Sequence, residues 1–319
     1  MLLNVIKFLI VFFGCIIIVA LMSLLERKII GGMQRRKGPN VMGLGGLLQP
    51  LADALKLFLK ESIVPNLSNR MIFLLSPIIL LSLTLVSWSV LPVDVGKVYS
   101  DVNSSVLFLL VVSSLSIYGI IMAGWSSNSK YAFLGGLRSA AQMISYEVGI
   151  GLYILVCCIV FNSLNLMEVS IYQSWVWLFI PLHMVCVLFF ISALAETNRT
   201  PFDLPEAEAE LVSGYNVEYS SMTFALFFMA EYGTMLVMSV LMSVLYLGSW
   251  YLLGYKCIFF YSIKVVGILC LFIIIRGALP RYRYDQLMCL GWKMLLPLAL
   301  GFIIWVSGIM LILLNYEIF

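Results

Sequence analysis

Long apolar runs dominate this sequence of 319 residues and decide what it can fold into. A helix needs about 20 largely apolar residues to cross a bilayer, and the sequence contains eight runs of that kind. Charged residues make up only 11% of the chain, which is too few to cover a soluble protein of this size. We therefore predict an all-α integral membrane protein in which residues 1–319 form a single polytopic domain. The predicted spans lie near residues 3–25, 71–91, 106–125, 140–161, 175–195, 220–247, 258–275 and 290–314.

The basic residues are distributed unevenly between the predicted loops. Fifteen of the 19 Lys and Arg residues lie in or directly beside the loops at about 26–70, 126–139, 196–219 and 276–289. Because Lys and Arg are enriched on the inner side of membranes, these loops are predicted to face the cytoplasm or the mitochondrial matrix. Eight crossings then place both termini on the outer side, in the periplasm or intermembrane space.

The first inner loop contains an amphipathic segment at residues 47–61. Its polar residues Gln49, Asp53, Lys56 and Lys60 recur at spacings of 4, 3 and 4, which is a helical period. As a helix the segment is only about 22 Å long, too short to span a bilayer. It predicts a helix in the membrane interface, which either anchors the loop to the surface or forms a wall of an opening for a lipophilic ligand.

A second inner loop is strongly acidic. Its acids alternate with apolar residues and border two predicted spans, so we interpret them as functional rather than as an ordinary solvated loop. Glu206 and Glu210 are four residues apart and would share a helix face, where like charges repel and titrate as a coupled set. The six acids are Glu196, Asp203, Glu206, Glu208, Glu210 and Glu218.

Two further carboxyl groups lie inside predicted spans. Glu147 and Glu231 are each the only charged residue of their apolar run. A charge at the bilayer centre costs at least about 2.5–3.5 kcal/mol on insertion scales, so such groups usually face a polar interior and have a function. Together with the acidic loop, they have the composition of a proton path. The alternative is that the protonated carboxyls form hydrogen bonds between helices.

The sequence predicts no metal or nucleotide site in this chain. Its seven cysteines include no C-x-x-C pair, and His183 has no partner at ligand spacing. The glycine-rich stretch at 43–46 follows no predicted strand, so it is not a dinucleotide fingerprint.

Several longer motifs are recognisable. They are ERK at 26–28, MQRRKGPN at 33–40, GLLQPLADALKLFLKE at 46–61, GWSSNSKYA at 124–132, SYE at 145–147, ETNRTPFD at 196–203, ELVSGYNVEY at 210–219, MAEY at 229–232 and PRYRYDQLM at 280–288. With these motifs in order along essentially the whole chain, the sequence resembles the membrane subunit 1 family of respiratory complex I, called the H subunit in bacteria. Gly32, Ala207 and Cys289 depart from the usual family pattern, which leaves details of the ligand entrance open.

The resemblance implies a tilted bundle of eight core helices whose inner loops dock on a peripheral arm and close a quinone chamber. It also implies roles for particular residues. Those at the chamber and its entrance would be Arg27, Arg36, Asp53, Arg199, Asp203 and Arg276. Those on the proton path would be Glu147, Glu196, Glu206, Glu208, Glu210, Glu218 and Glu231. Those supporting the inner wall would be Arg281, Arg283 and Asp285.

The implied function is that of a core membrane subunit of a proton-pumping NADH:ubiquinone oxidoreductase. Ubiquinone would be the substrate, while NADH, FMN and iron–sulfur clusters would be bound by partner subunits. The expected partners are other membrane-arm and quinone-module subunits of complex I, ubiquinone and membrane lipids. The chain would have no catalytic residue of its own and no nucleic-acid partner. Its expected location is the mitochondrial inner membrane, with a bacterial inner membrane as the alternative. A stand-alone proton or cation transporter, the membrane subunit of an energy-converting hydrogenase and a non-catalytic scaffold are the other hypotheses.

Overall fold

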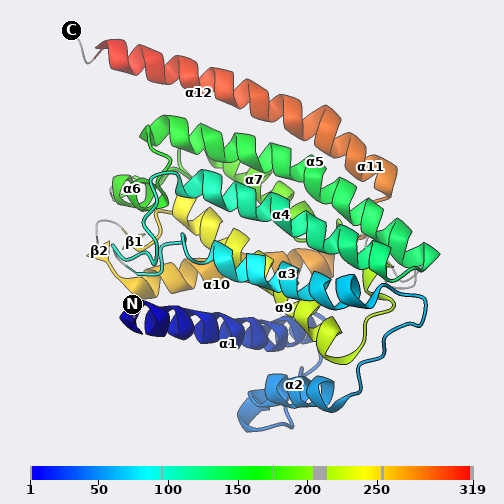
Figure 1. Cartoon of the computed structure of the whole chain (residues 1–319). Helices are drawn as coiled ribbons and strands as arrows, with labels where there is room; N and C mark the ends of the chain where they lie inside the picture. The colour runs from blue at the N-terminus through cyan, green and yellow to red at the C-terminus, as the bar shows by residue number, and fades with distance from the viewer. Residues whose placement is uncertain (1, 95, 175, 204–213, 253–254, 317–319) are drawn as a thin grey trace.

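The computed structural model describes residues 2–94, 96–174, 176–203, 214–252 and 255–316. Within these ranges the chain is almost entirely helical (Figure 1). The β structure there consists of a hairpin of two-residue strands, in which β1 (Tyr251–Leu252) runs antiparallel to β2 (Tyr255–Lys256), and of an isolated bridge between Asp94 and Lys97. The prediction of an all-α membrane protein is therefore confirmed.

Six helices in the described part of the chain are long and apolar enough to cross a membrane. The last of them is continuous over Tyr284–Leu313 and includes a π-helical stretch, η3 (Leu290–Leu295), before Pro297. A further long helix, α1 (Leu2–Met33), contains the first predicted apolar run. The six are α3 (Arg70–Ser87), α4 (Ser105–Ser126), α5 (Lys130–Phe161), α9 (Ser221–Leu245), α10 (Ile258–Ala278) and the α11–η3–α12 helix, with α11 at Tyr284–Cys289 and α12 at Leu296–Tyr316.

The fifth predicted span is shorter than expected. Residues 175–195 were predicted to be helical, but α7 (His183–Glu196) has only 14 residues and follows a short helix, α6 (Leu166–Tyr172), and a turn. The proline at position 181 disfavours helical geometry in the residue before it. In addition, the amide of Phe179 donates to the carbonyl of Tyr246 rather than to its own segment. At about 1.5 Å per residue, α7 is about 21 Å long and falls short of a 30 Å hydrocarbon core.

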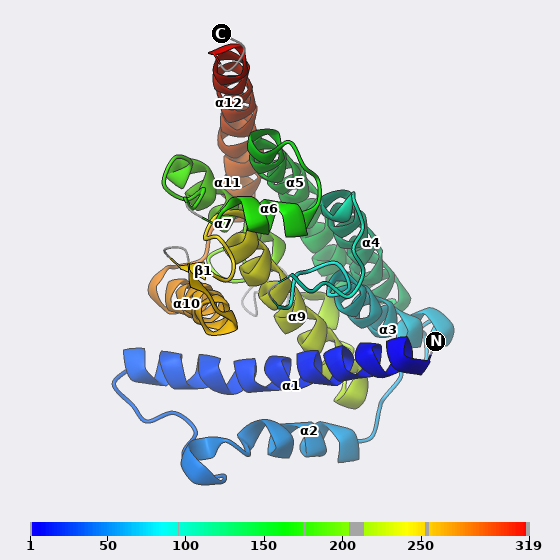
Figure 2. The ribbon, with the colours of Figure 1, turned by 90° about the vertical axis from the view of Figure 1, so that its left-hand side faces the viewer.

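The helices form a bundle with distinct edges. Figures 1 and 2 show α1 and the short α2 (Gln49–Leu59) as a layer on one side, with α9 and α10 next to it and α3, α4 and α5 beyond. The final helix lies at the opposite edge, where α12 packs on α5. The beginning of α1 and the end of α12 lie at the same end of the bundle (Figure 1).

The predicted helix at residues 47–61 is confirmed as α2, which is two residues shorter at each end. Its first turn contains Pro50, which fits there because the first amides of a helix have no intrahelical partner. Its residue Asp53 turns toward α1 and pairs with Arg27. Leu55, Lys56 and Phe58 are exposed.

Hydrogen bonds from α5 hold the last long helix. Tyr146 donates its hydroxyl to the carbonyl of Leu287 at 2.9 Å, and Tyr153 donates to the carbonyl of Leu295 at 3.0 Å. Both tyrosines are buried. This edge of the bundle is therefore fixed by specific polar contacts as well as by apolar packing.

A lysine on α10 contacts the segment that follows α9. The ammonium of Lys264 on α10 donates to the backbone carbonyls of Leu247 at 2.6 Å, Ser249 at 3.1 Å and Tyr251 at 2.6 Å. It also lies 4.3 Å from the centre of the Trp177 ring, within cation–π distance. All three of its N–H donors are therefore used.

Candidate functional site

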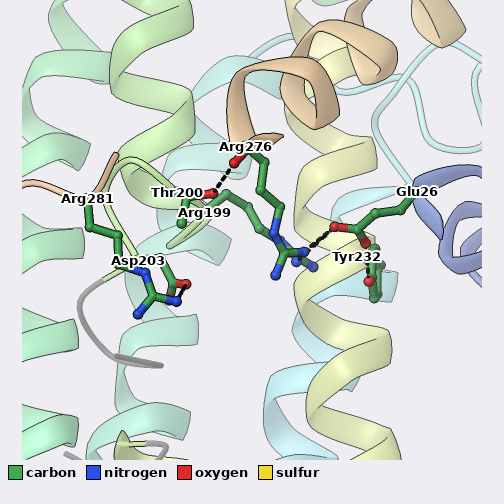
Figure 3. A network of polar contacts seen from close by, with 7 residues as sticks. All are labelled: Glu26, Arg199, Thr200, Asp203, Tyr232, Arg276 and Arg281. Atoms are coloured by element: carbon green, nitrogen blue, oxygen red, sulfur yellow. Dashed lines mark hydrogen bonds and ion pairs between the residues drawn. The ribbon is translucent and has the colours of Figure 1, made fainter. Parts of the chain in front are cut away.

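A buried ionic network lies where α1, the middle of α9 and the last turn of α10 meet the loop after α7 (Figure 3). Glu26 is at its centre and is only 5% exposed. One carboxylate oxygen of Glu26 is ion-paired with Arg276 and lies 3.8 Å from Nη1 of Arg199. The other oxygen accepts a hydrogen bond from the hydroxyl of Tyr232.

The local sequence explains why these groups meet. Glu26 directly follows the apolar run 3–25 and is the first charged residue after it. Arg276 lies in the last turn of α10, where the helix dipole favours a cation. The guanidinium of Arg199 lies 4.5 Å from the centre of the Tyr232 ring and stacks on it.

The electrostatics of the network favour an ionised Glu26. Burial by itself would raise the pKa of this carboxyl. The charges of Arg199 and Arg276, together with hydrogen bonds from Tyr232 and Arg276, outweigh burial and hold its pKa below the usual value. A carboxylate that neutralises two buried or half-buried arginines is thus a fixed charge of this site.

A second ion pair extends the network along the loop after α7. Asp203 is 2% exposed and accepts from Nη2 of Arg281 at 3.2 Å. Thr200 donates to the carbonyl of Arg276 at 3.3 Å, so the loop also contacts the end of α10 (Figure 3). The structure therefore brings together four predicted site residues: Arg199, Asp203, Arg276 and Arg281.

The same loop is fastened to α5 by a buried glutamine. Gln142 is fully buried, and its side-chain amide donates to the carbonyls of Ala195 and Phe202, both at 2.8 Å. Two backbone carbonyls from the ends of one loop thereby share a single side chain. The loop that carries Arg199 and Asp203 is consequently held in a defined conformation.

A cavity of about 440 Å³ opens beside the network, between α1, α2 and α9. Its walls are mostly apolar, but the Arg27–Asp53 ion pair at 2.6 Å and Tyr232 also line it. Tyr232 therefore lines the cavity and also donates a hydrogen bond to Glu26. The predicted entrance residues Arg27 and Asp53 are part of one site with the interfacial helix.

Three predicted residues are in a different environment. Arg36 is exposed in the loop after α1. Arg283 and Asp285 pair with each other at 3.1 Å, and both side chains are more than two-thirds exposed. These residues lie on the surface of the protein, where the described contacts do not connect them to the buried network.

The intramembrane carboxyls have hydroxyl partners. Glu147 on α5 accepts from Ser113 of α4 at 2.7 Å, and Glu231 on α9 accepts from Tyr215 at 2.7 Å. Tyr215 belongs to the short 3₁₀ helix η2 (Gly214–Asn216). The predicted alternative role, hydrogen bonding between helices, is therefore present in the structure, and it is compatible with a proton path.

The remaining acids of the predicted path differ in position. Glu196 is buried at the end of α7, whereas Glu218 is half-buried after η2. Glu206, Glu208 and Glu210 lie outside the described residues.

Close backbone packing positions η2. A Cβ atom on Gly135 of α5 would lie 2.7 Å from the Cα of Gly214, which is shorter than real Cβ contacts allow. Gly214 also has a positive φ of 62°, which favours glycine. The two glycines let the segment with Tyr215 approach α5 and present its hydroxyl to Glu231.

Two residues of the site had no role assigned from sequence. Glu26 and Tyr232 both lie in the recognised motifs, but their pairing joins residues 206 positions apart. The available signal was that Glu26 is the first acid of the chain and is followed at once by two basic residues. Among the described residues, no group of three or more His, Cys, Asp or Glu side chains could hold a metal ion.

Comparison with known proteins gives a consistent result. The family described as NADH dehydrogenase matches residues 6–307. NADH-ubiquinone oxidoreductase chain 1 of Chondrus crispus is 53% identical over 313 residues, which are 96% of each chain. The protein of the same name from Dictyostelium citrinum is 56% identical over 96% of this chain and 94% of the relative. The H subunit of NADH-quinone oxidoreductase from Paramagnetospirillum magneticum is 53% identical over 92% of this chain and 88% of the relative.

Matches of this extent cover the first predicted span, the ionic network and the last long helix alike. The chain therefore belongs to the family of respiratory complex I proteins known as chain 1 or the H subunit, the membrane subunit of NADH:ubiquinone oxidoreductase.

Proposed function

We propose that the cavity between α1, α2 and α9 admits quinone and that the ionic network around Glu26 forms part of its head-group chamber. One observation supports this most strongly: Tyr232 lines the cavity and is hydrogen-bonded to Glu26 in the network. The names of the relatives include ubiquinone and quinone as the electron acceptor.

The chemistry of the cavity suits such a ligand. Phe58, Phe224 and Phe228 contribute apolar surface for an isoprenoid tail. Arg27 provides N–H donors for carbonyl oxygens of a quinone ring. Because α2 lies in the membrane interface, a lipophilic molecule can enter the cavity without crossing water.

Reduction of the bound quinone requires two electrons and two protons. Partner subunits with NADH, FMN and iron–sulfur clusters supply the electrons, and this chain supplies the binding site and the surrounding charges. In this proposal the protons taken up by the reduced quinone change the ionisation of the buried carboxyls. The proposed proton route runs through Glu196, Glu147 and Glu231 and includes the acids at 206, 208 and 210. The change in ionisation of these carboxyls drives proton translocation.

The topology belongs to the same proposal. Eight crossings, with the 14-residue α7 and the turn before it as the fifth, would place the basic loops against the quinone module and both termini on the opposite, outer side. The finding that α1 begins and α12 ends at one end of the bundle supports an even number of crossings. We place the protein in the mitochondrial inner membrane, with the bacterial inner membrane as the alternative, because relatives of both kinds match it.

The proposal is tested by narrowing the cavity. Ala54 lines it, whereas Ala52 of the same helix does not. In the assembled complex, Ala54→Phe is expected to raise the KM for a long-tailed quinone several-fold, because the added ring occupies space that the ligand needs. Ala52→Phe is the matched control and should leave the KM close to that of the wild type.

Electron transfer from NADH to hexacyanoferrate, which does not use this cavity, should be unchanged in both variants. An Ala54→Phe complex that is assembled and reduces long-tailed quinone with the wild-type KM would contradict the proposed entrance. The names of the relatives favour this function over that of a stand-alone transporter or of a hydrogenase component.

A further inference from the structure

A surface hollow of about 470 Å³ lies where α3 and α5 begin and α4 ends. It shares no lining residue with the cavity beside α2. The hollow combines two aromatic rings with amide, hydroxyl and ammonium groups. The residues that contribute these groups are Trp125, Phe133, Asn69, Asn128, Ser129 and Lys130.

The hollow lies at the depth of lipid headgroups. The helices α3, α4 and α5 are each long and apolar enough to cross a membrane, so their ends mark the boundary between hydrocarbon and water. Three such ends meet here, because α3 begins at Arg70, α4 ends at Ser126 and α5 begins at Lys130. Trp125 is 56% exposed at this boundary, where an amphipathic indole ring is favoured. A ligand in the hollow therefore contacts the headgroup layer and the edge of the hydrocarbon.

The charge of the hollow is positive. Lys130 lines it, and none of the described lining residues is Asp or Glu. Lys130 is exposed and takes part in none of the ion pairs of the described chain. Arg70, which is also exposed, directly follows the lining residue Asn69. Basic pockets between the ends of membrane helices are suited to anionic lipid headgroups.

Exposed apolar side chains lead from the hollow along α4. They follow one another at spacings of 4, 4, 3 and 7 residues, which places them on one face of the helix. Each is between 44% and 60% exposed, and the last of them, Trp125, lines the hollow. This α4 stripe consists of Leu107, Val111, Leu115, Tyr118 and Trp125.

A second stripe follows α5, which packs against α4 (Figure 1). It begins at Phe133 in the wall of the hollow and continues at spacings of 4, 7, 4 and 7 residues, again on one helix face. This α5 stripe consists of Phe133, Leu137, Ile144, Val148 and Leu155. Two apolar stripes thus start at one basic hollow, and this arrangement matches a molecule with one charged headgroup and hydrocarbon chains.

We propose that the hollow binds the headgroup phosphate of a phospholipid with net negative charge, and that its acyl chains lie along the α4 and α5 stripes. The ammonium of Lys130 pairs with the phosphate, and the side-chain amide of Asn69 adds N–H donors. A membrane helix of a partner subunit would cover the two stripes, but it would leave Lys130 without an anion at headgroup depth. An anionic lipid matches both parts of this surface.

The test uses the assembled complex in vesicles of phosphatidylcholine doped with a phosphatidylglycerol probe that carries a photoreactive diazirine on one acyl chain. After illumination, peptide mass spectrometry measures the label on α4 and α5. Lys130→Gln removes the charge and Lys130→Arg retains it. Lys293→Gln is the matched control, because Lys293 is another exposed lysine of a long apolar helix and does not line the hollow. A phosphatidylcholine probe with the same chain is the control for the headgroup.

In the wild type, the phosphatidylglycerol probe is expected to label the peptides with Trp125 and Phe133 more strongly than the phosphatidylcholine probe does. Lys130→Gln should reduce this labelling about fivefold, the ratio that corresponds to about 1 kcal/mol for one basic residue at a membrane surface. Lys130→Arg should retain most of the labelling, and Lys293→Gln should match the wild type.

Three results would overturn the inference. Equal labelling by the two probes in the wild type would show that the hollow selects no headgroup. Unchanged labelling in Lys130→Gln would show that the lysine does not hold the phosphate. Absence of label from both stripes, with a partner subunit seen over the hollow in a map of the complex, would assign this face to a protein interface. The quinone cavity is separate from this site, so the proposed function would stand in each case.

Discussion

Glu26 joins three separate parts of the chain through one carboxylate. Its partners Arg199, Tyr232 and Arg276 come from the loop after α7, from α9 and from α10. Removing one member of a buried charge group is costly because the remaining charges stay buried without compensation. The energetic role of Glu26 is therefore to balance two arginines close to the cavity beside α2.

We predict that Glu26→Gln destabilises the complex by about 3 kcal/mol, the lower end of the range for broken buried pairs, because Arg276 remains partly exposed. The measurement is the unfolding temperature of the purified complex in detergent. Glu61→Gln is the control, since Glu61 is exposed on the same inner side. Equal unfolding temperatures for the two variants would contradict a stabilising role for the network.

The difference in stability between wild type and Glu26→Gln should depend on pH in a definite direction. The pKa of Glu26 is lowered in the folded protein by its arginines. The stabilisation is therefore fully present above the unfolded value of about 4.3, and it is lost as the pH falls through the lower folded value. The difference between wild type and Glu26→Gln should stay constant from about pH 7.5 to 5. A difference that already shrinks near neutral pH would mean that burial outweighs the arginines.

At the scale of single elements, α5 organises the molecule. It hydrogen-bonds the last long helix through Tyr146 and Tyr153, and it fastens the loop after α7 through Gln142. It also carries Glu147 and the close contact at Gly135. A change in one of these contacts therefore affects the attachment of a whole neighbouring element.

For α12 this attachment gives a prediction. Tyr153→Phe removes the hydrogen bond to Leu295 and should lower stability by about 1 kcal/mol. The loss should appear as faster hydrogen exchange in the peptide around residues 290–300, followed by mass spectrometry. Tyr118→Phe is the control, because Tyr118 is exposed on α4. Unchanged exchange in Tyr153→Phe would show that apolar packing alone holds this edge.

The elements also show what the sequence could predict. The helix α2 was predictable because its pattern is local: polar residues repeat at helical spacing over a few turns. The network around Glu26 was not, because its ion pair with Arg276 joins residues 250 positions apart and depends on how α1 and α10 pack. Likewise, the 3₁₀ helix with Tyr215 gave no sequence sign that it would meet Glu231.

Over the whole molecule, the ion pairs are sorted toward one end of the bundle. Apart from the exposed Asp94–Lys97 pair, the ion pairs of the described residues join α1 with α2, with the loop after α7 and with the last turn of α10, or lie in that loop and at the start of α11. The opposite end contains the β1–β2 hairpin, the beginning of α1 and the end of α12 (Figure 1). The basic end is the one that positive-inside statistics place on the inner side.

This sorting predicts the orientation in the membrane. A cysteine at Tyr255, which is 75% exposed beside the hairpin, should react with an impermeant maleimide added from the outer side. A cysteine at Asn40, which is exposed in the loop after α1, should react only after the membrane is made permeable. Peptide mass spectrometry locates each label and separates it from native cysteines. The reverse pattern would invert the proposed topology.

The hydrogen bonds of Lys264 after the end of α9 determine which substitutions this region tolerates. All three acceptors of the Lys264 ammonium are backbone carbonyls, so replacing the side chains at 247, 249 or 251 leaves them in place. The donor, in contrast, is a single side chain whose length and three protons no other residue type reproduces. Substitutions at 247, 249 and 251 can therefore keep these three hydrogen bonds. Nearly every substitution of Lys264, in contrast, removes them.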